Sequence, residues 1–127
     1  MAEVKPRVPT EEEEQITLFR WAEWMAQVRW PELAMMYHVP NGGYRNKAEA
    51  GRFRAQGVKS GVPDIVLPVA RGGYHGLYIE LKRTVGGRVS EEQREWLDRL
   101  TAQGYYTAVC RGWEAAKGVI EGYLQRD

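Results

Sequence analysis

The sequence predicts an α/β fold in which a central mixed β-sheet is flanked by helices. Two capping-box signatures, Thr10 with Glu13 and Ser90 with Gln93, each precede a helical pattern of apolar residues. Two apolar runs on either side of the turn at Gly72-Gly73 predict a pair of strands, and a third apolar run follows the second capping box. Helices and strands therefore mix along the chain, as they do in a sheet with helices packed against it.

The first 40 residues predict an arm, a helix and a short extended run within a chain of 127 residues. Residues 1–9 contain two prolines and mixed charges and predict a flexible arm, which leaves residues 10–127 as one domain. The first helix runs from its cap to about Val28, and its consecutive glutamates at 11–14 suit the positive end of the helix dipole. The apolar run at 33–39 predicts either a strand or an extended lead into the following turn.

The later elements follow from the same patterns. A basic, partly helical segment spans residues 41–61, before the predicted hairpin. A helix from the Ser90 cap to about Gln103, a strand at 105–110 and an amphipathic helix at 113–124 complete the fold. The one cysteine, Cys110, lies in the last apolar run and is interpreted as a buried structural thiol.

Three charged residues fall at one end of the predicted hairpin. Asp64 opens the first strand, and Glu80 and Lys82 close the second. Side chains alternate along a strand, so Glu80 and Lys82 point to the same face. If Gly72 and Gly73 are central, the numbers of paired residues sum to about 145 or 146, which places Asp64 beside the other two.

This trio fits the hydrolysis of phosphodiester bonds. Two carboxylates at close quarters repel unless a cation lies between them, and Mg²⁺ typically uses one or two carboxylates with water and substrate phosphate. A neighbouring lysine can position the attacking water and offset negative charge in the transition state. Taken alone, Glu-x-Lys is more often an ion pair on an exposed strand, so the interpretation depends on the hairpin that surrounds it.

The same residues resemble a known family. Pro63-Asp64 followed by Glu80-Leu81-Lys82 is similar to the PD-(D/E)XK nuclease signature. The surrounding motifs resemble the virus-type replication-repair nuclease (VRR-NUC) domain, over roughly residues 10 to 120 and closest to small stand-alone members of phages and bacteria. These motifs are Asn41-Gly42-Gly43, Gly61-Val62-Pro63-Asp64, Gly72-Gly73-Tyr74-His75-Gly76, Gln93 and Gly104-Tyr105. The resemblance implies a restriction-endonuclease-like core.

The resemblance also implies roles for individual residues. Asp64 and Glu80, with the Leu81 carbonyl, would hold Mg²⁺, for which Mn²⁺ can substitute, and Lys82 would position the water. A first-helix glutamate would assist; Glu14 matches best, although spacing alone leaves Glu11 open. Gln93 would approach the active site, yet its capping role competes for the same side chain.

Stand-alone members of the resembled family act as dimers on branched DNA such as Holliday junctions. The resemblance therefore implies a Mg²⁺-dependent endonuclease for branched DNA. A nuclease for flaps, nicks or ends is the alternative within the enzyme class. A DNA-binding module that performs no chemistry is the alternative outside it.

A cluster of cations precedes the Asp64 strand and predicts contacts to the DNA backbone. With Asn41 and Gly42, the predicted contacts are Arg45, Lys47, Arg52, Arg54 and Lys59. A solvated helix face would also explain these charges. The net charge of +1 gives no independent indication of a nucleic-acid partner.

The remaining features concern location and assembly. No apolar run approaches membrane-spanning length, and the single cysteine suits the cytoplasm, here of a bacterium or a phage-infected cell. His38 and His75 lack the spacing of a zinc site. Trp24, Trp30 and Tyr37 are candidates for a homodimer interface, or else cover the edge of the core.

Overall fold

The structure is a computed structural model that describes residues 6–40 and 46–127. Its elements follow the chain in this order: α1 (Glu11–Val28), the 3₁₀ helix η1 (Pro31–Met35), β1 (Tyr37–His38), α2 (Lys47–Ala55), β2 (Ile65–Leu67), β3 (Leu77–Lys82), α3 (Glu91–Ala102), β4 (Tyr106–Arg111) and α4 (Trp113–Leu124). The strands lie in the order β1-β2-β3-β4, antiparallel except for the parallel β3–β4 pair. The predicted α/β fold with a mixed sheet is confirmed.

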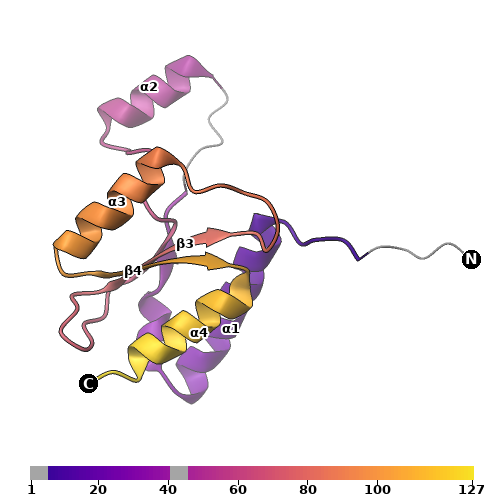
Figure 1. The fold of residues 1–127 in the computed structure, drawn as a ribbon, viewed down its shortest axis with the longest axis vertical. Helices are drawn as coiled ribbons and strands as arrows, with labels where there is room; N and C mark the ends of the chain where they lie inside the picture. The colour runs from indigo at the N-terminus through magenta and orange to yellow at the C-terminus, as the bar shows by residue number, and fades with distance from the viewer. Residues whose placement is uncertain (1–5, 41–45) are drawn as a thin grey trace, which may run out of the picture.

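The sheet separates two layers of helices (Figure 1). Helices α1 and α4 pack together on one face, where Leu18, Ile79 and Ile120 belong to one buried apolar cluster. Helix α3 crosses the other face on its way from β3 to β4. Helix α2 lies apart from the sheet, and none of its residues is buried.

Both predicted capping boxes are present. The Thr10 hydroxyl accepts a hydrogen bond from the Glu13 N–H while the Glu13 carboxylate accepts one from the Thr10 N–H. Ser90 and Gln93 make the same reciprocal pair at the start of α3. These caps satisfy backbone donors that the first helical turn cannot use, which explains why the helix starts were predictable.

The run at 33–39 splits into two elements. Pro31 occupies the first turn of η1, where its missing N–H costs nothing, and the 3₁₀ helix ends at Met35. Tyr37 and His38 then form β1 and pair with Val66 and Ile65 of β2. The expected strand is therefore only two residues long, but it adds an edge to the sheet beside Asp64.

The predicted hairpin register is wrong by one residue or more. Paired residues such as Ile65 with Ile79 and Leu67 with Leu77 have numbers that sum to 144, whereas Arg71 pairs with Tyr74 at the tip as expected. Pro68 accounts for the change, because it has no N–H for the ladder and the Val69 N–H turns back to the Leu67 carbonyl at 2.9 Å. The first strand thus contains one extra residue, as in a β-bulge.

Both Cys110 and Trp30 lie in the core, which for Trp30 agrees with the alternative that its ring covers the edge of the core. Cys110 is buried with 2% of its surface exposed, as predicted, and burial raises the pKa of its thiol to about 11. Trp30 is not a surface residue: it is 8% exposed and belongs to the core, with the Arg29 guanidinium 4.1 Å from its ring centre. The chain reverses direction after α1, which brings Trp30 back against the helix. Trp24, at 62% exposure, and Tyr37, at 49%, remain on the surface.

Candidate active site

Asp64 is held by its backbone as well as by its side chain. Its carbonyl oxygen accepts hydrogen bonds from the Val39 N–H and from His38 Nδ1, both at 2.8 Å. Its carboxylate Oδ1 accepts a hydrogen bond from the Leu81 N–H, also at 2.8 Å. The buried Pro63 precedes it and restricts the backbone on that side. Asp64 is therefore fixed between β1 and β3, with 7% of its surface exposed.

Glu80 lies directly across from Asp64. The Ile65–Ile79 pair sets the register, so the next residues in each direction, Asp64 and Glu80, face one another on one side of the sheet. Glu80 Oε1 accepts a hydrogen bond from Gln93 Nε2 at 3.0 Å and lies 3.6 Å from Lys82 Nζ. Its other oxygen, Oε2, is buried and accepts no hydrogen bond from the described residues. An acceptor oxygen buried without a donor is costly, which leaves this atom suited to a cation.

Burial makes both carboxylates reluctant to ionise. It raises the pKa of Asp64 to about 6, with a smaller contribution from the Glu11 charge, against the lowering effect of the Leu81 N–H. It also raises the pKa of Glu80 to about 8, and the nearby Asp64 charge adds to this while Lys82 opposes it. Near neutral pH Glu80 therefore keeps its proton in the metal-free site, and ionisation of both carboxylates together would need a cation besides Lys82.

The two candidate glutamates of α1 lie in different surroundings. Glu14 is buried, and its Oε2 packs against Gly112, where an added Cβ would lie only 2.9 Å from that oxygen. The Glu11 charge contributes to the pKa of both Asp64 and Glu80, and Glu11 is half-buried. The start of α1 therefore lies at this end of the sheet: Glu11 acts on the carboxylates electrostatically, and Glu14 packs against Gly112, whose N–H donates to the Lys82 carbonyl at 2.8 Å.

Gln93 makes both contacts that the sequence had set in competition. Its Oε1 accepts a hydrogen bond from the Ser90 N–H at 2.8 Å, and its Nε2 donates to Glu80 at 3.0 Å. The expectation that one side chain could hardly serve both roles is wrong, because the cap uses the amide oxygen and the carboxylate uses the amide nitrogen. The same residue therefore starts α3 and orients Glu80.

The basic segment is placed by contacts with α3. Ser60 Oγ donates to Glu92 at 2.5 Å, and the Trp96 indole donates to the Ser60 carbonyl at 3.1 Å. Gly61 has φ +84°, and a Cβ there would lie 2.9 Å from the Glu92 backbone, so this approach requires glycine. The exposed predicted contacts within the described residues are Lys47, Arg52, Arg54 and Lys59. Asn41, Gly42 and Arg45 lie outside the described residues.

The donor set fits a hard divalent cation in part. The described residues contain no cluster of three His, Cys, Asp or Glu side chains arranged to hold a metal. Two facing carboxylates, one with a buried oxygen that lacks a donor, match the sparse protein ligation typical of Mg²⁺, which keeps water and substrate phosphate as further ligands. The residues present therefore suit a cation that the substrate helps to hold.

Sequence reasoning missed two groups that shape this site. The sequence excluded His38 from a zinc site and indicated no other role, yet its ring holds the Asp64 backbone across 26 positions of sequence. The Ser60–Glu92 contact joins the basic segment to α3 and also spans a long stretch of chain. Neither contact leaves a local signal, because each depends on how distant segments pack.

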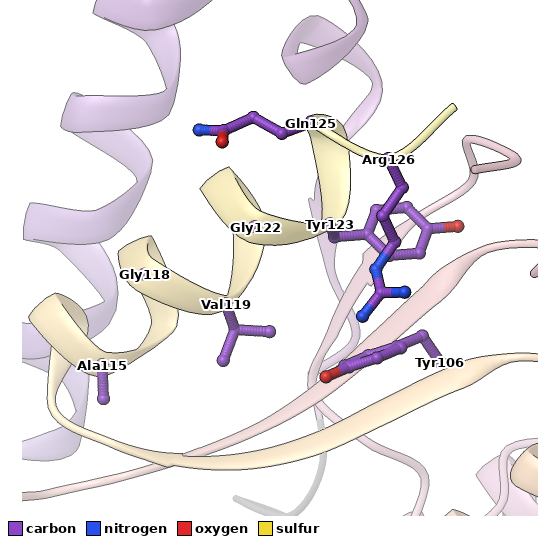
Figure 2. A pocket seen from close by; sticks show the side chains of 8 residues that line it. All are labelled: Tyr106, Ala115, Gly118, Val119, Gly122, Tyr123, Gln125 and Arg126. Atoms are coloured by element: carbon purple, nitrogen blue, oxygen red, sulfur yellow. The ribbon is translucent and has the colours of Figure 1, made fainter. Parts of the chain in front are cut away.

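A hollow elsewhere on the surface has no part in this chemistry. It has a volume of about 500 Å³ and lies between α4 and β4 (Figure 2). The strand register puts it on the opposite face of the sheet from Asp64 and Glu80. Gly118 and Gly122 leave it shallow, and the Arg126 guanidinium lies 5.1 Å from the centre of the Tyr106 ring. It contains no carboxylate among its lining residues.

Comparisons with known proteins agree on one family. Residues 11–114 match the VRR-NUC domain. A solved structure described as a VRR_NUC domain protein is similar to this chain at 30% sequence identity, with a TM-score of 0.82, covering 95% of this chain and 93% of that chain. Among proteins with curated descriptions, no match was found.

Proposed function

This chain belongs to the VRR-NUC family of nuclease-type domains, and from that premise we propose that it is a Mg²⁺-dependent endodeoxyribonuclease that cuts branched DNA. Mn²⁺ is expected to substitute for Mg²⁺. The observation that carries the proposal is the facing pair Asp64 and Glu80, with Lys82 and an unpaired, buried Glu80 oxygen beside it. A merely structural ion pair would not need the second carboxylate.

The proposed metal ligands are the carboxylates of Asp64 and Glu80 and the carbonyl of Leu81. When bound, Mg²⁺ would polarise the scissile phosphate and lower the pKa of a bound water. The Leu81 N–H holds Asp64 Oδ1, so this carboxylate is oriented before any ligand arrives.

Lys82 supplies the positive charge of the reaction. Its ammonium is 3.6 Å from Glu80 and largely buried, so the charge acts in a region of low dielectric. There it can hold the attacking water and stabilise the negative charge that develops on the phosphate. Gln93 keeps Glu80 oriented, and the Glu11 charge, which acts on Glu80, favours a cation at this end of the sheet; Glu14 is proposed to assist from the same helix.

DNA is the proposed partner, and the basic segment is proposed to bind its phosphate backbone. Lys47, Arg52, Arg54 and Lys59 are exposed, on a segment tied to the start of α3 through Ser60. Because Gln93 lies next to Glu92 in that same turn, backbone phosphates bound at α2 would be close to the carboxylates. The described residues contain no helix long and apolar enough to span a membrane. We propose that this protein acts in the cytoplasm of a bacterium or a phage-infected cell.

A homodimer would supply two cutting sites for a branched substrate. A four-way junction has two equivalent scissile phosphates, and a two-fold dimer is the commonest arrangement that presents two identical sites. Trp24 is the exposed aromatic residue of α1 proposed for this interface.

A cleavage panel tests the function. A four-way junction, a flap, a nicked duplex and a linear duplex of one sequence are incubated with Mg²⁺, with Mn²⁺ or with EDTA. Preferential, metal-dependent cutting of the junction supports the proposal, and preference for the flap, nick or end supports the alternative enzyme. Binding without cutting under every condition would leave a DNA-binding module. Asp64→Asn serves as the inactive control and Asp98→Asn, on the exposed side of α3, as the matched control.

A further inference from the structure

A row of tyrosines lies beside the carboxylates on the same face of the sheet. Tyr37 of β1 pairs with Val66 of β2, and Val66 pairs with Tyr78 of β3. Paired residues point to the same face, and so do residues two apart on one strand. Tyr78 therefore shares its face with Glu80, and Val66 shares it with Asp64.

The outermost ring of this row is open. Tyr37 is 49% exposed, whereas Val66 between the two tyrosines is 4% exposed. Tyr78 is half-buried and is supported edge-on by Tyr105, at 5.2 Å between ring centres. A tyrosine so exposed adds little to the core, and the hydrolysis chemistry does not use it.

The spacing to the carboxylates matches a nucleic-acid strand. One same-face step along a strand is about 7 Å, so Tyr78 is about that far from Glu80 along β3. Stacked nucleotides rise about 3.4 Å each along a strand. A ring in this row is therefore within a few nucleotides of a phosphate held at Asp64 and Glu80.

We propose that Tyr37, which shares its face of the sheet with Tyr78, stacks on an unpaired or unstacked base next to the scissile phosphate. The inference rests on the proposed nuclease function and narrows its substrate to DNA with an exposed base face at the cut. In a continuous duplex each base face is covered by its neighbours, whereas a branch point or a single-stranded flap leaves one open. Cations that hold the backbone, combined with aromatic rings that stack on bases, are the usual means of binding unpaired strands. Here the cations are on α2 and the ring is on β1.

Binding in EDTA separates this contact from cleavage. The probe is a flap DNA with 2-aminopurine at the first unpaired position, compared with a continuous duplex of the same sequence. We expect the wild type to quench the 2-aminopurine fluorescence of the flap, as stacking does. Tyr37→Ala should lose the quenching and about 5- to 100-fold in affinity for the flap, with little change for the duplex. Tyr37→Phe, which keeps the ring, should behave as the wild type.

Two further variants control for folding and for lost surface. Tyr37→Leu keeps an apolar side chain on β1 without an aromatic face, and should match Tyr37→Ala. Met35→Ala removes an apolar side chain of similar exposure, 51%, two residues earlier, and should bind the flap normally. Unchanged flap affinity in both Tyr37→Ala and Tyr37→Leu would overturn the proposal. A Tyr37→Phe variant that binds the flap as weakly as Tyr37→Ala would also overturn it. So would a Tyr37→Ala variant that loses the mass of a dimer but keeps its flap affinity.

The outcome for cleavage is independent. A wild type that binds the flap through Tyr37 but cuts no DNA with Mg²⁺ or Mn²⁺ would support the stacking surface and reject the nuclease. If Tyr37→Ala cuts flaps and junctions as well as the wild type does, with unchanged affinity, the nuclease function is supported and the stacking surface is rejected.

Discussion

The metal-free protein should lose stability as the pH rises from 5 to 8. The folded-state pKa of Glu80 is about 8, above its ordinary 4.5, and that of Asp64 is about 6, above its ordinary 3.8. Between these limits the folded state binds more protons than the unfolded state, so the free energy of unfolding falls with increasing pH. The Glu13–Arg7 pair does not interfere, because it lowers the pKa of Glu13 to about 2 and its stabilisation disappears only in acid.

The size of the effect follows from the pKa of Glu80. A group that is protonated in the folded state and ionised in the unfolded state changes the free energy of unfolding by about 1.4 kcal/mol per pH unit. The three units from pH 5 to 8 therefore set a ceiling of about 4 kcal/mol for one group. Glu80 is 3% exposed, so solvent screens little of this cost. We expect urea unfolding in EDTA at 25 °C to show a loss of about 2–4 kcal/mol across this range.

Glu80→Gln isolates the contribution of this carboxylate. Glutamine can still accept the Gln93 hydrogen bond but carries no charge. The free energy of unfolding of the variant should therefore exceed that of the wild type by about 1–3 kcal/mol at pH 8, reduced by the loss of the Lys82 ion pair. At pH 5 the two proteins should differ little. Glu95→Gln, at an exposed position of α3, is the matched control. Adding Mg²⁺ should stabilise the wild type more at pH 8 than at pH 5 and should leave Glu80→Gln unchanged. A wild type whose stability is flat or rising over this range, or a Glu80→Gln curve parallel to it, would refute the reasoning.

Four other outcomes are expected. Asp64→Asn and Lys82→Ala should each abolish cleavage, measured on gels of the products, and leave DNA affinity in EDTA nearly unchanged, measured by band shifts. Full cutting by Asp64→Asn would exclude Asp64 from the active site. Replacing Arg52 and Arg54 with glutamine should weaken binding similarly for all sequences and reduce the salt slope by about one per lost phosphate contact, whereas Arg20→Gln on α1 should not. Gln93→Ala should slow cleavage more than Ser90→Ala does. Both variants lose the helix cap, worth about 1 kcal/mol, but only Gln93→Ala removes the hydrogen bond to Glu80. Equal cleavage rates in the two variants would make Gln93 purely structural. Light scattering at micromolar concentration should give the mass of a dimer that Trp24→Glu disrupts, and a monomeric wild type would exclude paired junction cleavage.

The features that the sequence predicted well are those with local causes. A capping box is complete within four residues, so Thr10 and Ser90 mark their helices without any knowledge of the fold. The convergence of Asp64 with Glu80 also has a short-range cause, since one hairpin brings the two strands together. Burial of Cys110 follows from the apolar residues around it in β4.

The features that it predicted badly depend on distant packing or on one atypical residue. The sequence left Trp30 open between a homodimer interface and the edge of the core, and only the return of the chain against α1 decides for the core. The register prediction failed because a symmetric hairpin was assumed through Pro68, which cannot donate to the ladder. No local pattern distinguishes Glu11 from Glu14, because what separates them is the packing of Glu14 against Gly112, nearly a hundred residues later.

The register of the hairpin decides which residue of β3 faces Asp64. A sum of 145 would set Asp64 opposite Leu81, whose side chain points to the apolar face, and a sum of 146 would set it opposite Lys82 as an ordinary ion pair. The extra residue at Pro68 instead sets carboxylate against carboxylate. Burial raises the pKa of both groups, and the nearby Asp64 charge raises that of Glu80 further. Burying two facing carboxylates costs stability in the metal-free chain, and the cation proposed to bind there would offset that cost. The bulge is therefore part of the proposed active site, although it lies at the far end of β2 from Asp64.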